Sequence, residues 1–509
     1  MKAKKKRSYV SDITTGALGL VLIGLAACSS GESTPTTGTP APAGSAGKTS
    51  ALVFVNNTGD KTLTSVALKG DSGNAVVNTI DAAEFENVAL SDMQFSSGNW
   101  VFVNLTAANK VATVDPLSAA TPEHEVILPA GTRPVHIYRD PNDKEVIWTM
   151  NDGDNASGTT TPGDDLVNCN NPARTGGAVG GGSVTVMHNS HLGPGATPPR
   201  VLRTTCVLAD GHKVAAFAEN GRVFVSSTTA GEIAVLDGVE TSGTYLQMIA
   251  RIDLCNPTKE TCNDESTTSL TTAFTPNGSE PHGIRWSKLT KKIYSFQEGY
   301  QEIAEIDPVA VGTPGAQVIT KKFDLAGTPY TGYGISPDGR FLLLRGDTTP
   351  STGTKLGVID LNTATGTRTD FDIDQLDGAS PGAFKFSPDG KRFYILAGNA
   401  AASTKKDRLF AFDASTLTAT PPALTLLREI SLIAGGDSVG FDAAHNFDVL
   451  AQGAGEAKYI AVSNRVDNSV SIINATDNLI KQTVQVGTSP GAALVYQSGA
   501  AQAGNQATN

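Results

Sequence analysis

Several motifs that would point to a familiar chemistry are missing from this chain of 509 residues. Cysteine occurs five times, and no pair of cysteines forms a Cys-x-x-Cys or Cys-x-x-Cys-His motif. This absence argues against thioredoxin-like redox chemistry and against covalent attachment of a c-type haem. The zinc-protease motif His-Glu-x-x-His is also absent, so the sequence carries no metalloprotease signature of that kind.

The N-terminus has the features of an export signal. Five Lys and Arg residues within the first seven positions precede an apolar run at 17–27, which is the order found in signal peptides. This run of 11 residues is well short of the about 20 that a transmembrane helix needs. It ends at Leu25-Ala26-Ala27-Cys28, which resembles the lipobox of bacterial lipoproteins. The resemblance implies cleavage before Cys28 and acylation of its thiol; an ordinary secretory signal with a stray cysteine is the alternative.

The composition divides the rest of the chain into a tether, a folded region and a tail. Residues 28–50 are rich in Ser, Thr, Pro, Gly and Ala, a composition that cannot bury enough apolar surface to fold. We therefore expect a signal peptide at 1–27, the lipidated cysteine and a disordered tether at 28–50, a folded domain at 51–498 and a disordered tail at 499–509. Several acyl chains hold a protein at a membrane. The expected location is the cell envelope, outside the cytoplasm, and Ser29 favours the outer membrane where the cell has one.

Basic residues are too few for a protein that binds nucleic acid. Removal of residues 1–27 leaves 34 basic and 49 acidic side chains, a formal net charge of −15. A chain of this sign does not attract a phosphate backbone. We expect a monomeric protein without a nucleic-acid partner.

The four cysteines beyond Cys28 predict disulfides, because an even number in an oxidising compartment favours pairing. Cys255 and Cys262 flank a short loop that contains Asn and Pro, so we expect these two to pair. That leaves Cys169 to pair with Cys206, and metal ligation by the four thiols is the alternative.

The folded region contains a sequence repeat, which favours one repeat domain over several separate domains. One short β-branched or aromatic run recurs eight times, beginning at Leu52, Trp100, Glu145, Arg222, Lys292, Arg340, Arg392 and Lys458. Tight turns precede several copies, most plainly 336–339 and 387–390, which both read Ser-Pro-Asp-Gly. A further strand ending in an acid follows, as at Asp237 and Asp360. Strands and turns without a helical period predict an all-β array of four-stranded antiparallel units, with strands A to D.

Radial packing of such units gives a single β-propeller, which hides strand edges. The chain begins inside a unit, with a strand B at Leu52, and ends with a lone strand A at 491–496. Pairing of these N- and C-terminal pieces would close the ring. The eight copies predict eight blades; seven blades, the commoner number, is the alternative.

The repeat resembles the YVTN-type β-propeller repeat found in exported bacterial proteins and in lactonase-like propellers. The resemblance covers about residues 51–498 and rests on the strand-B runs, the Pro-Gly-x-x-x-x-Ser-Pro-Asp-Gly segment at 381–390 and the Gly-Val-Ile-Asp segment at 357–360. The tetrapeptide itself is imperfect, with Tyr459-Ile460-Ala461-Val462 among its nearest equivalents. The resemblance implies the fold, whereas a lactonase-like activity would need a base and a carbonyl-polarising group, for which His282 and Arg133 are the candidates.

The long insertions fall on one face of the predicted propeller. Residues 151–182 join a strand B to a strand C, and residues 255–280 join a strand D to a strand A, so both lie opposite the short Ser-Pro-Asp-Gly turns. Long loops on a rigid scaffold commonly carry binding sites. We therefore predict a binding or scaffold module, rather than an enzyme, that engages a protein or glycan partner through this loop-rich face.

Histidine is scarce, with seven residues in the chain, so the positions of these residues are informative. His136, His212 and His282 each lie at the start of a predicted strand A, near the mouth of the central channel. Neutral imidazole is a common ligand of transition metals, so the three rings predict a site for a transition metal or another cofactor. A metal-binding envelope protein is thus the alternative function; hydrogen bonds from each ring to loop carbonyls are the structural alternative.

Two further polar groups suggest metal binding less strongly. His188 and His191 stand three positions apart, with His188 in place of the usual strand-C acid, and a structural hydrogen bond is the favoured interpretation. The segment 151–155 with Asp164 and Asp165 offers oxygen ligands that suit Ca²⁺. It lacks EF-hand spacing, so a solvated loop is favoured there.

Overall fold

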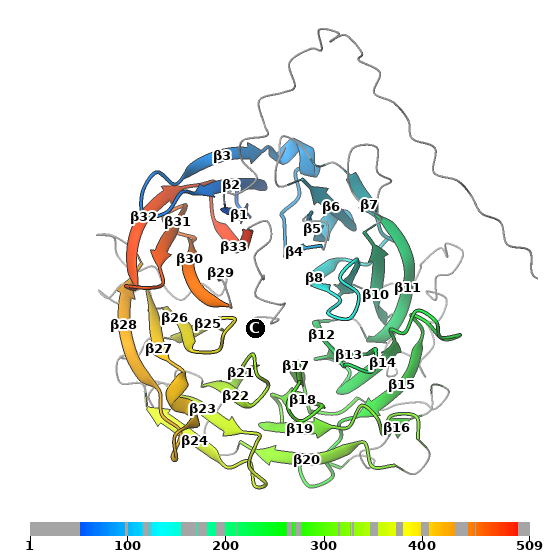
Figure 1. The fold of residues 1–509 in the computed structure, drawn as a ribbon. Helices are drawn as coiled ribbons and strands as arrows, with labels where there is room; N and C mark the ends of the chain where they lie inside the picture. Colours follow the sequence, from blue (N-terminus) through cyan, green and yellow to red (C-terminus); the bar gives the residue numbers. More distant parts are fainter. Residues whose placement is uncertain are drawn as a thin grey trace, which may run out of the picture. The chain divides into compact units, whose positions relative to one another are not determined.

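Eight antiparallel sheets arranged in a ring form the β-propeller of this computed structural model (Figure 1). The chain divides into two units, 1–46 and 47–509, and the residues that the structure describes lie between 51 and 496 of the second unit. The longest gaps within this range are 154–180 apart from Cys169, 190–198, 347–354, 373–379, 399–406 and 433–445. The predicted signal peptide, Cys28, the tether and the tail lie outside the described residues. No described helix is long and apolar enough to span a membrane.

The innermost strand A of each blade faces the central channel (Figure 1). From blade 1 to blade 8, these strands are β33 (Pro490–Tyr496), β4 (Met93–Phe95), β8 (Pro134–Arg139), β12 (Lys213–Phe217), β17 (Pro281–Ser287), β21 (Tyr330–Ile335), β25 (Ser380–Phe386) and β29 (Phe447–Gln452). In the same order, strand B is β1 (Ala51–Asn57), β5 (Val101–Leu105), β9 (Val146–Asn151), β13 (Arg222–Ser227), β18 (Lys292–Gln297), β22 (Phe341–Gly346), β26 (Arg392–Gly398) and β30 (Glu456–Asn464). Each strand B contains one copy of the sequence repeat, either whole or without its first residue, which confirms eight blades.

The two outer strands complete each blade. Strand C is β2 (Thr62–Leu68), β6 (Lys110–Val114), β10 (Gly181–His188), β14 (Glu232–Asp237), β19 (Glu302–Ile306), β23 (Lys355–Asp360), β27 (Arg408–Asp413) and β31 (Ser469–Asn474). Strand D is β3 (Ala75–Ile80), β7 (His124–Ile127), β11 (Arg200–Ala209), β15 (Met248–Asp253), β20 (Ile319–Asp324), β24 (Arg368–Asp372), β28 (Thr425–Ser431) and β32 (Leu479–Gln485). Blade 4 has a fifth strand, β16 (Thr267–Thr268). Short 3-10 helices are η2 (Ala82–Phe85), η3 (Thr106–Ala108) and η6 (Ser415–Thr418).

The Ser-Pro-Asp-Gly segments form the predicted turns between strands A and B. In blade 6 the Gly339 amide donates to the Ser336 carbonyl at 2.8 Å, and Gly339 has a φ of 79°. A Cβ at this glycine would stand 2.7 Å from the Lys288 backbone nitrogen, so the close approach also requires glycine. The tight turn sets the register of the hairpin.

The acid that ends strand C stabilises the connection to strand D. Asp360 Oδ1 accepts the Asn362 amide at 2.9 Å, and both Asp360 oxygens accept the Arg340 guanidinium, at 2.9 and 2.7 Å. Such a bidentate pair is the strong form of an ion pair. In blade 3 the acid and its partner change places. Glu145 directly precedes strand B, where blade 6 has Arg340, and His188 ends strand C, where blade 6 has Asp360. His188 Nε2 lies 3.4 Å from Glu145 Oε2. The predicted structural role of His188 therefore has a defined partner.

The ends of the described chain close the ring within blade 1. Strand β1 pairs with the C-terminal β33 through Leu52↔Tyr496, Val53↔Val495 and Phe54↔Leu494, as the sequence predicted. The apolar core lies between blades; for example, Phe54 and Tyr496 of blade 1 pack in one cluster with Phe95 of blade 2. Neighbouring blades therefore fix each other's positions.

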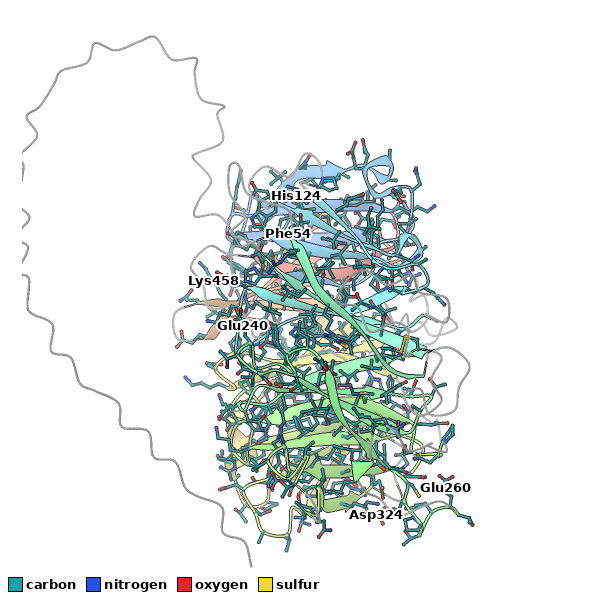
Figure 2. The ribbon with its side chains drawn as sticks, turned by 90° about the vertical axis from the view of Figure 1, so that its right-hand side faces the viewer. Phe54, His124, Glu240, Glu260, Asp324 and Lys458 are labelled. Atoms are coloured by element: carbon teal, nitrogen blue, oxygen red, sulfur yellow. A yellow bond between two sulfur atoms is a disulfide. The ribbon has the colours of Figure 1, made fainter. Side chains whose placement is uncertain are left out.

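The two faces of the propeller differ in their connections. Figure 2 shows Glu240, between β14 and β15, and Lys458, early in β30, on one side of the ring, with Glu260, between strands D and A, on the other. The described ends of the insertions at 151–182 and 255–280 lie on the face of Glu260, as predicted. We call it the loop face.

Candidate functional site

Three histidines from successive blades lie together at the loop-face end of the channel wall. His136 is in β8, His212 directly precedes β12, and His282 is in β17. The ring centroids of His136 and His212 are 4.8 Å apart, and those of His212 and His282 are 5.3 Å apart. The structure thus brings together the three imidazoles that the sequence singled out.

Local backbone irregularity turns two of these side chains out of regular pairing. Arg133 and Glu280, each before a proline, have φ values of 49° and 46°, a left-handed conformation that non-glycine residues rarely adopt. The pairing register between strands A and B shifts between Pro134 and His136 in blade 3, and between Pro281 and Ile284 in blade 5. Strained backbone of this kind gathers at functional sites.

Each imidazole has its own carboxylate partner at Nδ1. The His282 Nδ1 to Glu298 Oε2 distance is 2.7 Å, and the His136 Nδ1 to Asp92 Oδ2 distance is 3.4 Å. His212 Nδ1 lies 3.5 Å from Asp152 Oδ2. Three carboxylates therefore surround the row of rings, and we call these six residues the histidine–carboxylate cluster.

Asp152 is held in place from several sides. Its backbone amide donates to the Arg133 carbonyl at 3.2 Å, and its carbonyl accepts the Gly211 amide at 3.0 Å. Its Oδ1 accepts the Lys213 amide at 3.1 Å. The Asp152 carboxylate therefore lies between His212 and the Lys213 amide. Asp154, Asp164 and Asp165, the other residues of the Ca²⁺ site considered above, lie outside the described residues.

Solvent exposure decreases along the row of histidines. The His282, His212 and His136 side chains are 32%, 28% and 15% exposed. The Nε2 atoms of His212 and His136 are buried and have no hydrogen-bond partner in the described part of the chain. A buried polar atom without a partner costs about 1–3 kcal/mol, so the fold maintains two unsatisfied ring nitrogens here.

Electrostatics keep the central ring neutral. Burial lowers the pKa of His212, and the neighbouring His136 and His282 lower it further against the opposing effect of Asp152. A neutral imidazole offers the lone pair that a metal ion needs. The row therefore combines a neutral nitrogen donor with nearby negative charge.

The side chains do not stand as a formed metal site. As they are placed, no group of three or more His, Cys, Asp or Glu residues among the described ones could hold a metal ion. The rings meet edge to face, with interplanar angles of 77° and 71°, so they are not directed at one centre. Coordination would require the rings to turn about their side-chain bonds.

The other predicted sites have different outcomes. Cys169 and Cys206 form the predicted disulfide, which is fully buried. Cys255 is also disulfide-bonded, and its predicted partner Cys262 lies outside the described residues, as does His191.

The candidate groups for a hydrolase have the following settings. Arg133, the candidate carbonyl-polarising group, has an exposed side chain. The pentapeptides at 378–382 and 487–491 match Gly-x-Ser-x-Gly, but Ser380 begins β25 and Ser489 directly precedes β33. A nucleophile elbow leads from a strand into a helix, so neither serine has that setting.

The carboxylates of the cluster escaped the sequence analysis. Asp152 and Glu298 each directly follow a strand B, and Asp92 directly precedes a strand A. These positions belong to the loop face, as do the starts of the strands that carry the histidines. An acid at the loop-face end of a strand next to a histidine-bearing one is the signal that could have identified them.

Comparisons with known proteins show the fold alone. The chain matches no protein family profile and no curated protein sequence. Two structures of AztD from Citrobacter koseri, one of them the apo form, are 12% identical to it. The match covers 88% and 89% of this chain and 98% and 99% of theirs, with TM-scores of 0.53 and 0.55. A Bacteroides uniformis ATCC 8492 protein named as a proposed 6-phosphogluconolactonase is 13% identical over 88% of this chain and 100% of its own, with a TM-score of 0.47. The chain is therefore similar in fold to AztD.

Proposed function

We propose that this protein is an extracytoplasmic, lipid-anchored β-propeller that binds a divalent transition metal ion through His136, His212 and His282. The observation that carries the proposal is the row of three adjacent imidazoles, two of which keep buried Nε2 atoms without partners. Imidazole nitrogen suits Zn²⁺, Cu²⁺ and Ni²⁺, whereas Ca²⁺ and Mg²⁺ prefer oxygen. The cargo class is therefore a borderline transition metal.

The charge of the cluster favours a cation. Asp92, Asp152 and Glu298 lie within 3.5 Å of the three rings, and the central ring is held neutral. Tetrahedral Zn–N bonds of about 2.0–2.1 Å place ligand nitrogens about 3.4 Å apart. Ring centroids 4.8 and 5.3 Å apart allow this spacing within each adjacent pair after rotation of the rings.

Three protein ligands would leave one position of a tetrahedral ion open. Such a site exchanges its fourth ligand, unlike a closed structural site. The cluster lies on the loop face, and His282 is its most exposed ring. A metal ion could therefore enter and leave on the side of His282. We infer reversible metal carriage or sensing rather than a structural metal.

Titration of the purified domain tests the site directly. One equivalent of Zn²⁺ or Cu²⁺ is expected to bind. Excess metal should raise the unfolding midpoint, because a free ligand at 100 times its Kd stabilises the native state by about 2.7 kcal/mol. His212→Ala should abolish both effects. His188→Ala is the matched control, since His188 contacts Glu145 at the end of strand C, away from the cluster. Equal binding by wild type and His212→Ala would refute the site.

The anchor is tested separately in cells. Wild-type protein should fractionate with membranes and incorporate labelled fatty acid, because acylation of Cys28 supplies the attachment. Cys28→Ser should do neither and should accumulate as unprocessed precursor. Release of wild type without label would refute the lipid anchor and leave the metal proposal untouched.

A further inference from the structure

The pairing of every ring with a carboxylate determines which nitrogen remains for a ligand. An ionised carboxylate only accepts hydrogen bonds, so Glu298 Oε2, at 2.7 Å, requires a proton on His282 Nδ1. The same logic applies to His136 beside Asp92 at 3.4 Å. In each neutral ring the lone pair then belongs to Nε2.

The partner-free Nε2 atoms agree with this assignment. In His136 and His212 the nitrogens that face a carboxylate are Nδ1, and the nitrogens without a hydrogen-bond partner are Nε2. The two nitrogens of each ring therefore have separate environments. One is polarised by an anion, and the other is free to donate its lone pair.

The carboxylates differ in how firmly they hold their rings. Glu298 makes the short contact, and it belongs to the same blade as His282, at the end of its strand B. Asp92 and Asp152 reach across from the preceding blade at 3.4 and 3.5 Å. The orientation of the outermost ring thus depends on one strong contact within a blade.

We propose that Glu298 is a positioning residue that holds the His282 imidazole as its Nδ1–H tautomer and directs Nε2 to the metal. Asp152 and Asp92 do the same, more weakly, for His212 and His136. This inference rests on the proposed metal site. Carboxylates that accept from ligand histidines orient the ring and raise its basicity, and their loss typically weakens metal binding 10–100-fold. Glu298 acts through His282 and does not itself ligate the ion.

Three variants separate positioning from ligation. Glu298→Ala removes both charge and acceptor and should weaken Zn²⁺ binding 10–100-fold, measured by competition with a chromogenic chelator. Glu298→Gln keeps an acceptor oxygen and should restore part of that loss. Glu280→Gln is the matched control, because Glu280 is exposed and its carboxylate has no hydrogen bond to a cluster ring among the described residues. His282→Ala should lose more affinity than any of them.

The tautomer gives a readout that needs no metal. Nitrogen-15 NMR of the metal-free protein should show His282 as the Nδ1–H form in wild type and Glu298→Gln, and as the Nε2–H form or a mixture in Glu298→Ala. Unchanged tautomer and affinity in Glu298→Ala would refute the positioning role while leaving wild-type metal binding intact. A loss in both Glu298 variants equal to that of His282→Ala would also refute it, because Glu298 would then be a ligand. Failure of the wild type to bind any metal would refute the proposed function instead.

Discussion

Glu232 offers the sharpest test of the electrostatics of this propeller. It is the first residue of β14, and it is fully buried beside Arg251 of β15, which is also fully buried. The Arg251 Nη1 to Glu232 Oε1 distance is 3.6 Å, and neither Glu232 oxygen accepts a hydrogen bond among the described residues. Burial raises the pKa of Glu232 to about 8, against the opposing effect of Arg251. At neutral pH the side chain is therefore mostly protonated.

The magnitude follows from the difference between the folded and unfolded states. An unfolded Glu has a pKa of 4.5, and each pKa unit corresponds to 1.36 kcal/mol. A raised carboxyl pKa means that stability is fully present below pH 4.5 and is lost as pH rises toward 8. Keeping Glu232 protonated at pH 7 therefore costs about 3 kcal/mol. Glu232→Gln, which has no proton to lose, should remove this cost.

The assay compares unfolding by denaturant for wild type and Glu232→Gln from pH 4.5 to pH 9. The variant should gain about 3 kcal/mol over wild type at pH 7, relative to their difference at pH 4.5, and about 5 kcal/mol above pH 8. Glu302→Gln is the comparison at the same position of blade 5, where Asn256 Nδ2 donates to Glu302 at 2.9 Å and Lys322 Nζ lies 3.3 Å away. Because that substitution removes real partners, it should be less stabilising at every pH. Destabilisation of Glu232→Gln by 3–5 kcal/mol at pH 7 would instead show an ionised pair with Arg251 and refute the reasoning.

Three further predictions concern acid, the disulfide and ring closure. Since the pKa of His212 is lowered from 6.5, the metal-free protein should lose stability as pH falls below 6.5, and His212→Gln should lose less between pH 7.5 and 5.5 in thermal unfolding. Replacing Cys169 and Cys206 by alanine should lower the free energy of unfolding by about 4 kcal/mol in denaturant titrations, since the bridge closes a sequence separation of 37 residues; an unchanged midpoint would contradict this. Truncation before Pro490 removes β33 and the partner of β1, so the product should aggregate on size exclusion, whereas truncation after Tyr496 should leave the unfolding midpoint unchanged.

The repeat made the fold predictable from the sequence. Each strand-B run pairs on both sides within a blade, and the glycine turn at 336–339 requires a tight hairpin wherever it recurs. These are local properties of short segments, so eight copies predicted eight blades. The pairing of Leu52 with Tyr496 followed from counting, because one unit lacked its first strand and the C-terminus supplied one.

The site was only half visible in the sequence. Rarity and position at the starts of innermost strands singled out His136, His212 and His282, and ring centroids 4.8 and 5.3 Å apart now place them side by side. Their carboxylate partners were missed, and Asp152 was grouped with a calcium loop. Two of the three contacts cross between blades, so their distances depend on how neighbouring sheets pack.

The sequence by itself determined the export signal pattern, the strand repeat and the three histidines, because these depend on residues close together along the chain. Tertiary structure alone decided that the three rings adjoin, that each Nδ1 faces an anion and that two Nε2 atoms are buried without partners. The physical reason is the geometry of a propeller. Its blades are defined locally, whereas the residues of the cluster come from successive blades and meet only when neighbouring blades pack together.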